Sequence, residues 1–230
     1  MATLENHLID LLPRTDRLRF LAACEKVELV LSDVLCVPSE ATSHIYFPVA
    51  GFISLVAVIE GSPGLEVGMV GREGMLGAQA VLGVDIAPLR AVVQGAGAAW
   101  RVTTERFQSQ LVASPSLKRV LDRYVSVLMT QLTTSAGCLR FHEVGPRLAR
   151  WLLMSQDRAQ SDNFQMTHEF LAYMLGVRRE SVTAAAGVLQ HGGLIEYARG
   201  DLTVLNRAGL ESAACGCYKV ARAGYVDVLG

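Results

Sequence analysis

Residues 166–195 constrain the fold of this chain more than any other stretch, and they read MTHEFLAYMLGVRRESVTAAAGVLQHGGLI. Apolar residues recur every three or four positions on both sides of Gly176, which predicts two short helices joined by a tight turn. Gly176 lies where the first helix must end, and glycine tolerates the positive φ that such a turn requires. Thr167 is the expected N-cap of the first helix. The segment is therefore predicted to be a helix-turn-helix.

Side chains at the start of the second helix are typical of a DNA-reading surface. Ala172 in the first helix is small enough to let the second helix cross it closely. The start and outer face of the second helix carry five polar residues: Arg178, Arg179, Glu180, Ser181 and Thr183. Such side chains can hydrogen-bond to base edges in a DNA major groove. With Thr167 they are the predicted DNA-binding residues, and the alternative is an ordinary helical hairpin with a solvated charged end.

The residues that follow the second helix are typical of a β-hairpin. Two apolar segments, 194–198 and 202–205, flank Arg199, Gly200 and Asp201, which suit a tight turn. A hairpin directly after a recognition helix is called a wing. Arg199 at the tip of this wing is expected to reach a DNA phosphate.

Composition and charge limit the classes of protein to which the chain can belong. Hydrophobic residues make up 51% and charged residues 19%, so a packed core is expected rather than disorder. No apolar run approaches the ~20 residues that span a bilayer, and the first residues lack a signal-peptide pattern. A cytoplasmic protein without a membrane partner is therefore expected. The net charge of -1 means that the DNA-binding prediction depends on local geometry, not on bulk charge.

The first 105 residues are expected to form a β domain. Residues 4–24 read as a short helical lead-in, and frequent glycines then separate short apolar segments. Residues 53–59 and 65–70 are strand-like, and residues 60–64 between them are expected to turn. This pattern suits a compact β-barrel or jelly roll.

Residues 106–142 are expected to form a long dimerisation helix. Residues separated by four and three positions in turn predict a heptad seam, whose members are Leu121, Val125, Leu128, Leu132, Ser135 and Leu139. Its five leucine and valine residues are the predicted dimerisation residues. A second apolar stripe runs along the same helix: Leu117, Val120, Tyr124 and Val127. One stripe can pack on the β domain, and a second copy of the helix is the simplest partner for the other. The alternative is a single wide buried face within a monomer.

Residues 143–230 are predicted to form the winged helix-turn-helix domain. Gly145 and Pro146 lie near a hinge with the preceding helix, and the polar residues 156–165 are expected to form a loop that leads into the motif. The expected fold class is therefore α+β. A dimer would present two recognition helices to a DNA site with two-fold symmetry.

This order of domains resembles that of the CRP/FNR family of bacterial transcription regulators, which have a cyclic-nucleotide-binding-like β domain. The most specific match is residues 176–182, GVRRESV, which are similar to the family segment G-x-S-R-E-T-V. The resemblance implies that Arg179 contacts guanine, that Glu180 accepts a hydrogen bond from cytosine, and that RNA polymerase is a partner. Ala184 stands where the family often has a further arginine, and Arg178 replaces a small polar residue, so a different operator is expected.

The effector site departs from the family pattern more strongly. Members that bind cyclic nucleotide use a glutamate for the ribose and an arginine for the phosphate. Here Ala78 replaces that glutamate, and the arginine is displaced by one position to Arg90. A one-residue displacement in a strand points the side chain to the opposite face. We therefore expect no dependence on cyclic AMP, an unknown effector, and only Gly77 and Arg90 as candidate ligand-binding residues.

No metal or cofactor is predicted from the cysteines. They are odd in number and scattered, which does not suit a disulfide framework. Cys24 and Cys36 are too few and too far apart for the iron–sulfur cluster of the family's oxygen-sensing branch. Cys215 and Cys217 could ligate a metal or sense redox state, but a C-x-C pair without nearby ligands is more often inert.

No catalytic site is expected. Residues 71–77, GREGMLG, lack the ending of a P-loop and the Rossmann fingerprint. His7 and His44 are haem candidates only in the sense that any histidine is. The leading interpretation is a homodimeric regulator that binds a pseudo-palindromic operator. The alternative is a small-molecule, haem or redox sensor whose β domain binds the effector that controls DNA binding.

Overall fold

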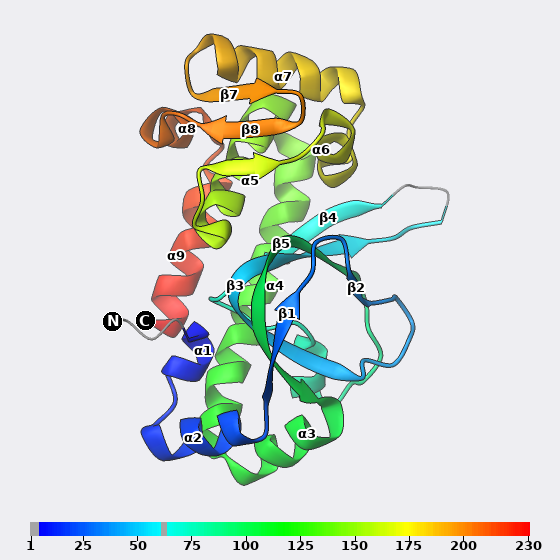
Figure 1. Cartoon of the computed structure of the whole chain (residues 1–230), viewed down its shortest axis with the longest axis vertical. Helices are drawn as coiled ribbons and strands as arrows, with labels where there is room; N and C mark the ends of the chain where they lie inside the picture. The colour runs from blue at the N-terminus through cyan, green and yellow to red at the C-terminus, as the bar shows by residue number, and fades with distance from the viewer. Residues whose placement is uncertain (1–4, 61–63) are drawn as a thin grey trace.

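The computed structural model describes residues 5–60 and 64–230, and a β domain lies below a helix-turn-helix head (Figure 1). The predicted α+β fold class is confirmed. Two short helices, α1 (His7–Asp10) and α2 (Arg14–Ala22), form the expected lead-in. None of the helices in these two described ranges is long and apolar enough to cross a membrane.

The β domain is built from five antiparallel strands: β1 (Glu25–Leu29), β2 (Val34–Cys36), β3 (His44–Ala57), β4 (Leu65–Val70) and β5 (Arg90–Thr103). Their order is β1-β5-β3-β4, and β2 also pairs with β5. The register between β3 and β5 shifts three times between Pro48 and Ile53, and such bulges bend a sheet. Most of the turn predicted at residues 60–64 lies outside the described residues. A 3₁₀ helix, η1 (Ala78–Leu82), closes one side of this domain.

The single helix expected over residues 106–142 is two helices. They are α3 (Thr104–Ala113) and α4 (Pro115–Phe141), and the chain breaks between them at Ser114. The Ser114 hydroxyl accepts a hydrogen bond from the Leu117 amide at 3.3 Å, and Pro115 occupies the first helical position. A capping serine followed by proline starts a new helix, because proline cannot donate the backbone hydrogen bond that would continue the old one.

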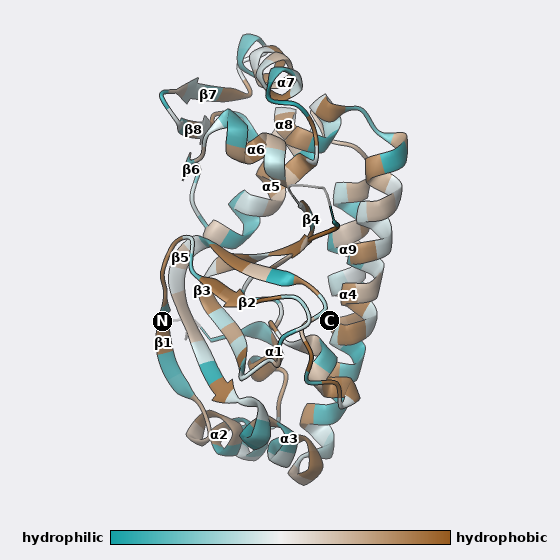
Figure 2. Cartoon of the chain, turned by 90° about the vertical axis from the view of Figure 1, so that its right-hand side faces the viewer, coloured by the Kyte–Doolittle hydropathy of each residue, from teal (hydrophilic) through white to brown (hydrophobic). Residues whose placement is uncertain are grey.

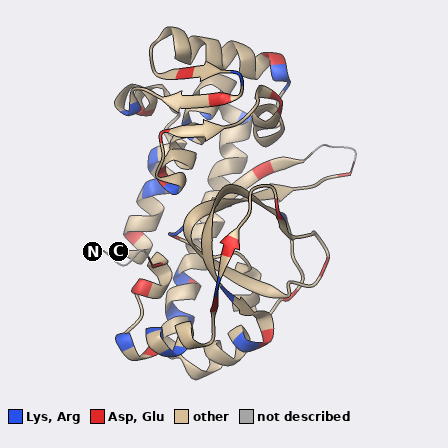
Figure 3. Cartoon of the chain, in the orientation of Figure 1, with Lys and Arg blue, Asp and Glu red and all other residues tan. Residues whose placement is uncertain are grey.

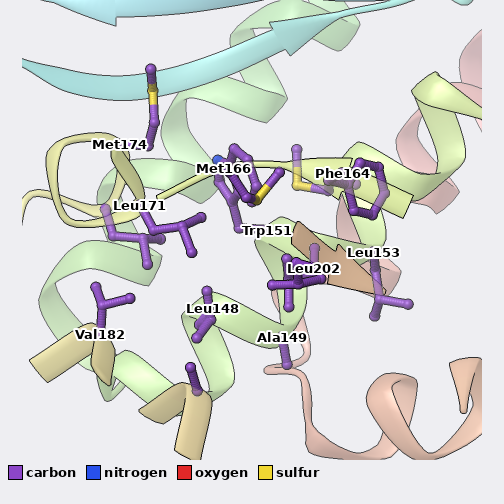
Figure 4. Close-up of a cluster of buried hydrophobic side chains, with 14 of the residues drawn as sticks. Leu148, Ala149, Trp151, Leu153, Phe164, Met166, Leu171, Met174, Val182 and Leu202 are labelled. Carbon is purple, nitrogen blue, oxygen red and sulfur yellow. The ribbon is translucent and has the colours of Figure 1, made fainter. Parts of the chain in front are cut away.

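The head begins after a two-residue connection at His142 and Glu143. Its elements are α5 (Val144–Ala159), β6 (Asn163–Gln165), α6 (His168–Leu175), α7 (Arg179–His191), β7 (Ile195–Ala198), β8 (Asp201–Val204) and α8 (Arg207–Ala213). The prediction of a loop at residues 156–165 is wrong, because α5 continues to Ala159 and β6 pairs with β8. Figure 4 shows the core that holds the head together, in which Leu148, Val182 and Leu202 lie close to one another.

The head and the β domain share one hydrophobic core. Phe52, Val56 and Met69 of the β domain belong to the same buried cluster as the side chains of α5, α6 and α7. A polar contact crosses the same boundary, where the indole N–H of Trp151 donates a hydrogen bond to Oε1 of Glu66 at 2.8 Å. The position of the head is therefore fixed by packing against β3 and β4 as well as by the connection to α4.

The last helix, α9 (Cys217–Leu229), returns from the head and packs along α4. Figures 1 and 2 both place these two helices beside each other. Leu229 enters the same core as Leu121 and Tyr124, and the Gln131 amide donates a hydrogen bond to the Tyr225 hydroxyl at 3.3 Å. A helix of the same chain therefore covers part of the apolar surface of α4.

This packing corrects the predicted dimer seam at one residue. Leu121 has 0% exposure within a single chain, so no surface of its side chain is left for a second copy. The other four predicted residues, Val125, Leu128, Leu132 and Leu139, are half-buried. The heptad spacing could not separate Leu121 from them, because the burial of Leu121 comes from segments far away in the sequence.

Candidate nucleic-acid interface

The helix-turn-helix geometry follows from the residues that define its turn. The Thr167 hydroxyl accepts a hydrogen bond from the Phe170 amide at 3.1 Å, which makes it the N-cap of α6. Gly176 ends that helix with φ at 61°, a left-handed conformation that suits glycine. The Val177 amide then donates to the Ala172 carbonyl at 3.0 Å. These contacts set the direction in which α7 leaves the turn.

The predicted polar residues lie on the open face of α7. Arg178, Arg179, Glu180 and Thr183 are exposed, and Ser181 is half-buried. The buried side of the helix carries Val182, Ala185, Ala186 and Leu189. Figure 3 shows basic and acidic residues next to each other at the start of α7, at an outer corner of the head. The structure thus brings together a guanidinium pair and a carboxylate on a protruding helix end.

Two aromatic residues support this face through a contact that the sequence analysis did not predict. The His168 ring stacks on the Tyr197 ring with centroids 4.2 Å apart and planes inclined by 18°. Nδ1 of His168 lies 2.9 Å from the Thr183 hydroxyl, which itself donates to the Arg179 carbonyl at 3.1 Å. Burial, followed by the charge of Arg179, lowers the pKa of His168. The Thr183 hydroxyl is therefore engaged within the protein, while the side chains of Arg179 and Glu180 extend past it.

The wing is a tight two-residue hairpin. Arg199 and Gly200 have φ values of 52° and 93°, the left-handed pair that a type I′ turn requires. Asp201 lies in β8 and pairs with Ala198, so the turn is shorter than the three residues expected. The Met166 amide donates to the Gly200 carbonyl at 2.7 Å, which anchors the wing to the segment before α6. Arg199 is exposed in this turn. The turn between β7 and β8 lies on the side of the head from which α7 begins (Figure 1).

A second candidate site lies in the β domain, between η1 and α4. It is a cavity of about 170 Å³. Its walls are largely apolar and include Leu55, Met75, Leu89, Val125, Leu128 and Leu132. No lysine, arginine, aspartate or glutamate of the described residues lines it. Such a cavity suits an apolar ligand, because an ion placed there would lose its hydration without gaining a partner.

The two candidate ligand-binding residues are not brought together. Gly77 lines the cavity, whereas Arg90 is exposed and lies outside the lining. The neighbouring Leu89 takes the inner position. Ala78 also lines the cavity and offers no charge. The described wall of the cavity therefore lacks both the cation and the acid that would meet a cyclic nucleotide.

Residues 146–213 match the family model of the Crp-like helix-turn-helix domain. The chain carries a Crp-like helix-turn-helix domain in a CRP/FNR fold. This match covers α5 to α8, which are the elements that carry and support the exposed end of α7. A comparison with curated proteins gave no match.

Solved structures of CRP/FNR regulators resemble nearly the whole chain. A CRP/FNR-family protein from Eubacterium rectale is 14% identical with a TM-score of 0.71, over 91% of this chain and 99% of its own. The c-di-GMP-responsive global regulator CLP from Xanthomonas campestris is 18% identical with a TM-score of 0.68, over 84% and 99%. A CRP/FNR-family transcriptional regulator from Thermus thermophilus is 23% identical with a TM-score of 0.68, over 83% and 98%. At these identities the likeness establishes the CRP/FNR fold.

Proposed function

We propose that this CRP/FNR-fold protein is a sequence-specific transcriptional regulator that binds a pseudo-palindromic DNA operator as a homodimer. The observation that carries the proposal is the exposed start of α7, where Arg178, Arg179 and Glu180 project from a Crp-like helix-turn-helix. We place the protein in the cytoplasm, where DNA and RNA polymerase are its partners. Its proposed action is binding and not catalysis.

The proposed roles of the DNA contacts follow from side-chain chemistry. Arg179 can donate two hydrogen bonds to a guanine, and Glu180 can accept one from a cytosine amino group. Arg178 and Arg199 are exposed cations suited to phosphates. Thr167 and Ser181 offer hydroxyl groups at the starts of α6 and α7. Thr183 is assigned a supporting role, since its hydroxyl already bonds within the head.

The proposed dimer uses the face of α4 that its own chain leaves open, and part of this face is also the α4 wall of the apolar cavity. Met129 is 62% exposed although it is a large apolar residue, and it lies between the half-buried Val125 and Leu132. These residues follow one another at intervals of four and three positions, as in a coiled-coil seam. With Leu128 and Leu139 they form the proposed interface, and Met129 takes the place of Leu121. Two heads related by this seam would face two half-sites of one DNA duplex.

A second candidate function is the sensing of a small molecule in the β domain, for which the apolar cavity is the supporting observation. A ligand of the native state would raise the thermal midpoint of unfolding. We expect an upward shift from small apolar molecules and none from cyclic AMP. A shift produced by cyclic AMP and not by apolar molecules would contradict the proposal of an apolar ligand, and no shift with either would remove this candidate. The response of the Xanthomonas regulator to c-di-GMP does not extend to this proposal, because the described cavity wall lacks cations for its phosphates.

Selection from a library of random DNA duplexes tests the main proposal. The full-length protein should enrich sequences with two-fold symmetry and half-sites about one helical turn apart. The pair Arg179→Ala and Glu180→Ala should change the enriched half-site. Arg222→Ala is the matched control, because Arg222 is exposed on α9, outside the Crp-like domain. An unchanged half-site in both Arg179 and Glu180 variants would show that α7 does not read the DNA.

Sedimentation of the purified protein tests the dimer separately. Met129→Glu should shift the mass from dimer to monomer, because it places a charge in the proposed apolar seam. Val112→Glu is the matched control, since Val112 is 88% exposed on α3 and lies outside the seam. A wild-type monomer, or equal dissociation of both variants, would refute the seam.

A further inference from the structure

Four metal-ligating side chains meet where the head joins the long helix. Cys138 lies in the last turn of α4 and His142 directly follows that helix, whereas Cys215 lies between α8 and α9 and Cys217 is the first residue of α9. The two Sγ atoms of Cys138 and Cys215 are 3.5 Å apart, and Sγ of Cys217 is 3.6 Å from Nδ1 of His142. All four ligand atoms lie within 4.8 Å of one another. The fold therefore supplies the nearby ligands that the C-x-C pair lacks in the sequence.

The two distances of 3.5 and 3.6 Å are close to the edges of a metal tetrahedron, and the other ligand atoms, within 4.8 Å, are near enough to close around one ion. Zinc lies about 2.3 Å from thiolate sulfur and about 2.0–2.1 Å from imidazole nitrogen. Tetrahedral angles then place two sulfurs about 3.8 Å apart and a sulfur and a nitrogen about 3.5 Å apart. We propose that Cys138, His142, Cys215 and Cys217 form a structural Cys3His site for zinc.

The arrangement of the ligands favours a single ion over other uses of the thiols. Cys138 lies in the last turn of α4, and His142 is the C-cap of that helix, whose amide donates a hydrogen bond to the Cys138 carbonyl at 3.1 Å. A disulfide between Cys138 and Cys215 would need the sulfurs to approach to about 2.05 Å and would leave Cys217 and His142 without a role. A closed set of four protein ligands leaves no open coordination position, which is the mark of a structural site and not of a catalytic one.

The four ligands differ in burial, so that one side of the site is shielded from water and the other side is accessible from solvent. Cys138 and Cys215 are buried at 1% and 8% exposure, whereas Cys217 is half-buried and His142 is exposed. The two buried thiols can exclude water from one side of the ion. The exposed imidazole and the half-buried thiol face the route by which the ion would enter from solvent.

Two arginines of α5 are placed to balance the charge of the loaded site. Three thiolates and one Zn²⁺ carry a net charge of -1. Arg147 and Arg150 line a small pocket together with Cys138. Nε of Arg150 is buried without a hydrogen-bond partner among the described residues, although its other end donates to the Ser135 hydroxyl at 3.2 Å. An anionic metal–thiolate centre beside these cations would supply the missing favourable interaction.

The site would fasten the connection between the head and α4. Its four ligands span the end of α4 and the start of α9, and the Cys215 amide donates to the Pro146 carbonyl of α5 at 3.3 Å. One ion would therefore hold the end of α4 against the start of α9, and the bond from Cys215 would link this pair to α5. We expect metal to stabilise the native arrangement, because the unfolded chain does not hold these ligands together.

Titration of the full-length, reduced and metal-free protein with Co²⁺ tests the proposal. Co²⁺ reports the geometry of a zinc site through thiolate-to-metal charge-transfer absorption and intense visible bands when the site is tetrahedral. We expect both features to saturate at one ion per chain and to disappear when Zn²⁺ is added. Cys217→Ser should weaken Co²⁺ binding by at least about tenfold. Cys24→Ser is the matched control and should leave binding unchanged.

Two further measurements separate a lost ligand from a lost fold. His142→Ala removes an exposed ligand, so its circular dichroism should match the wild type while its Co²⁺ spectrum changes. Metal analysis and mass spectrometry of the purified protein should find zinc and free thiols. A folded, reduced protein without the charge-transfer band would overturn the proposal. So would equal weakening by Cys217→Ser and Cys24→Ser, or a metal-free protein with a Cys138–Cys215 disulfide.

Discussion

The start of α7 and the cavity of the β domain, the two candidate binding sites, differ in shape and in polarity. The start of α7 is convex and exposed, and it presents Arg178, Arg179 and Glu180 to solvent. The cavity is concave, and apolar side chains such as Leu89 and Leu132 form most of its wall. The difference teaches that the two regions suit different partners: the start of α7 offers charged groups that fit the proposed DNA contact, whereas the described wall of the cavity offers an apolar surface without charged side chains.

The two regions also differ in how far they depend on distant parts of the chain. The exposed face of α7 is set by residues within the helix-turn-helix. The cavity wall combines β2, β3, the residues around η1, and α4. Three changes to the chain test this comparison, beginning with the largest expected effect.

Removing core volume from the head should show how strongly its stability depends on the buried packing that it shares with the β domain. Leu152 has 0% exposure in the core shared by the head and the β domain. Leu152→Ala should lower the free energy of unfolding by about 2–5 kcal/mol, through lost burial and the cavity it creates. Urea denaturation measures this change. Val188→Ala, at a site 72% exposed on α7, should stay within about 0.5 kcal/mol, and an equal loss in both variants would contradict the packing.

A half-buried carboxyl at the boundary between the head and the β domain should make stability depend on pH. Burial raises the pKa of Glu66 from 4.5 to about 7, although hydrogen bonds from Ser54 and Trp151 oppose the rise. The charges of Arg150 and Arg158 oppose it too. The folded state therefore keeps a proton that the unfolded state has lost. The contribution of Glu66 to stability should be greatest below pH 4.5, fall as the pH rises to about 7, and then level off.

Glu66→Gln isolates this contribution. The amide cannot ionise, so the variant should lack the fall in stability between pH 4.5 and about 7. The fall in the wild type amounts to as much as about 3 kcal/mol for a shift of this size. Urea denaturation of both proteins at several pH values gives the difference. Parallel curves would mean that Glu66 does not carry the effect.

Two substitutions at neighbouring positions test whether the cavity excludes a charged side chain. Leu89 lines the cavity and Arg90 is exposed. Leu89→Arg should lower stability by about 1–3 kcal/mol, since its guanidinium would enter a wall whose described residues include no acidic partner. Arg90→Leu should change stability by less than about 0.5 kcal/mol. Thermal unfolding compares them, and a larger loss from Arg90→Leu would reverse the assignment of the inner face.

The helix-turn-helix could be predicted from sequence because its determinants are local. Thr167, Gly176 and the apolar spacing around them act within a few residues, and the structure bears out their cap and turn geometry. The order of domains followed from the same kind of signal. The break at Ser114 was missed, although a serine followed by Pro115 is itself a local signal for a helix start.

Contacts between distant segments could not be predicted in this way. Nothing near Leu121 in the sequence indicates that α9 will return along α4 and share its core. The stacking of His168 on Tyr197 and the meeting of Cys138 with Cys215 likewise join segments that only the fold brings together. Spacing rules describe one helix or hairpin at a time, so they miss sites that are assembled from several.

The central claim is that Arg179 contacts one base of the operator. The most direct test combines the substitution of Arg179 with single base-pair changes in the DNA and measures whether their effects on affinity are coupled. The affinity of the wild type and of Arg179→Ala is measured for the selected operator and for operators with each half-site base pair changed in turn. We predict a loss of about 1–3 kcal/mol for Arg179→Ala on the selected operator. One guanine should account for this loss of binding free energy. Changing that base pair should weaken binding of the wild type but should not weaken binding of Arg179→Ala any further. Additive losses at every position would contradict the claim.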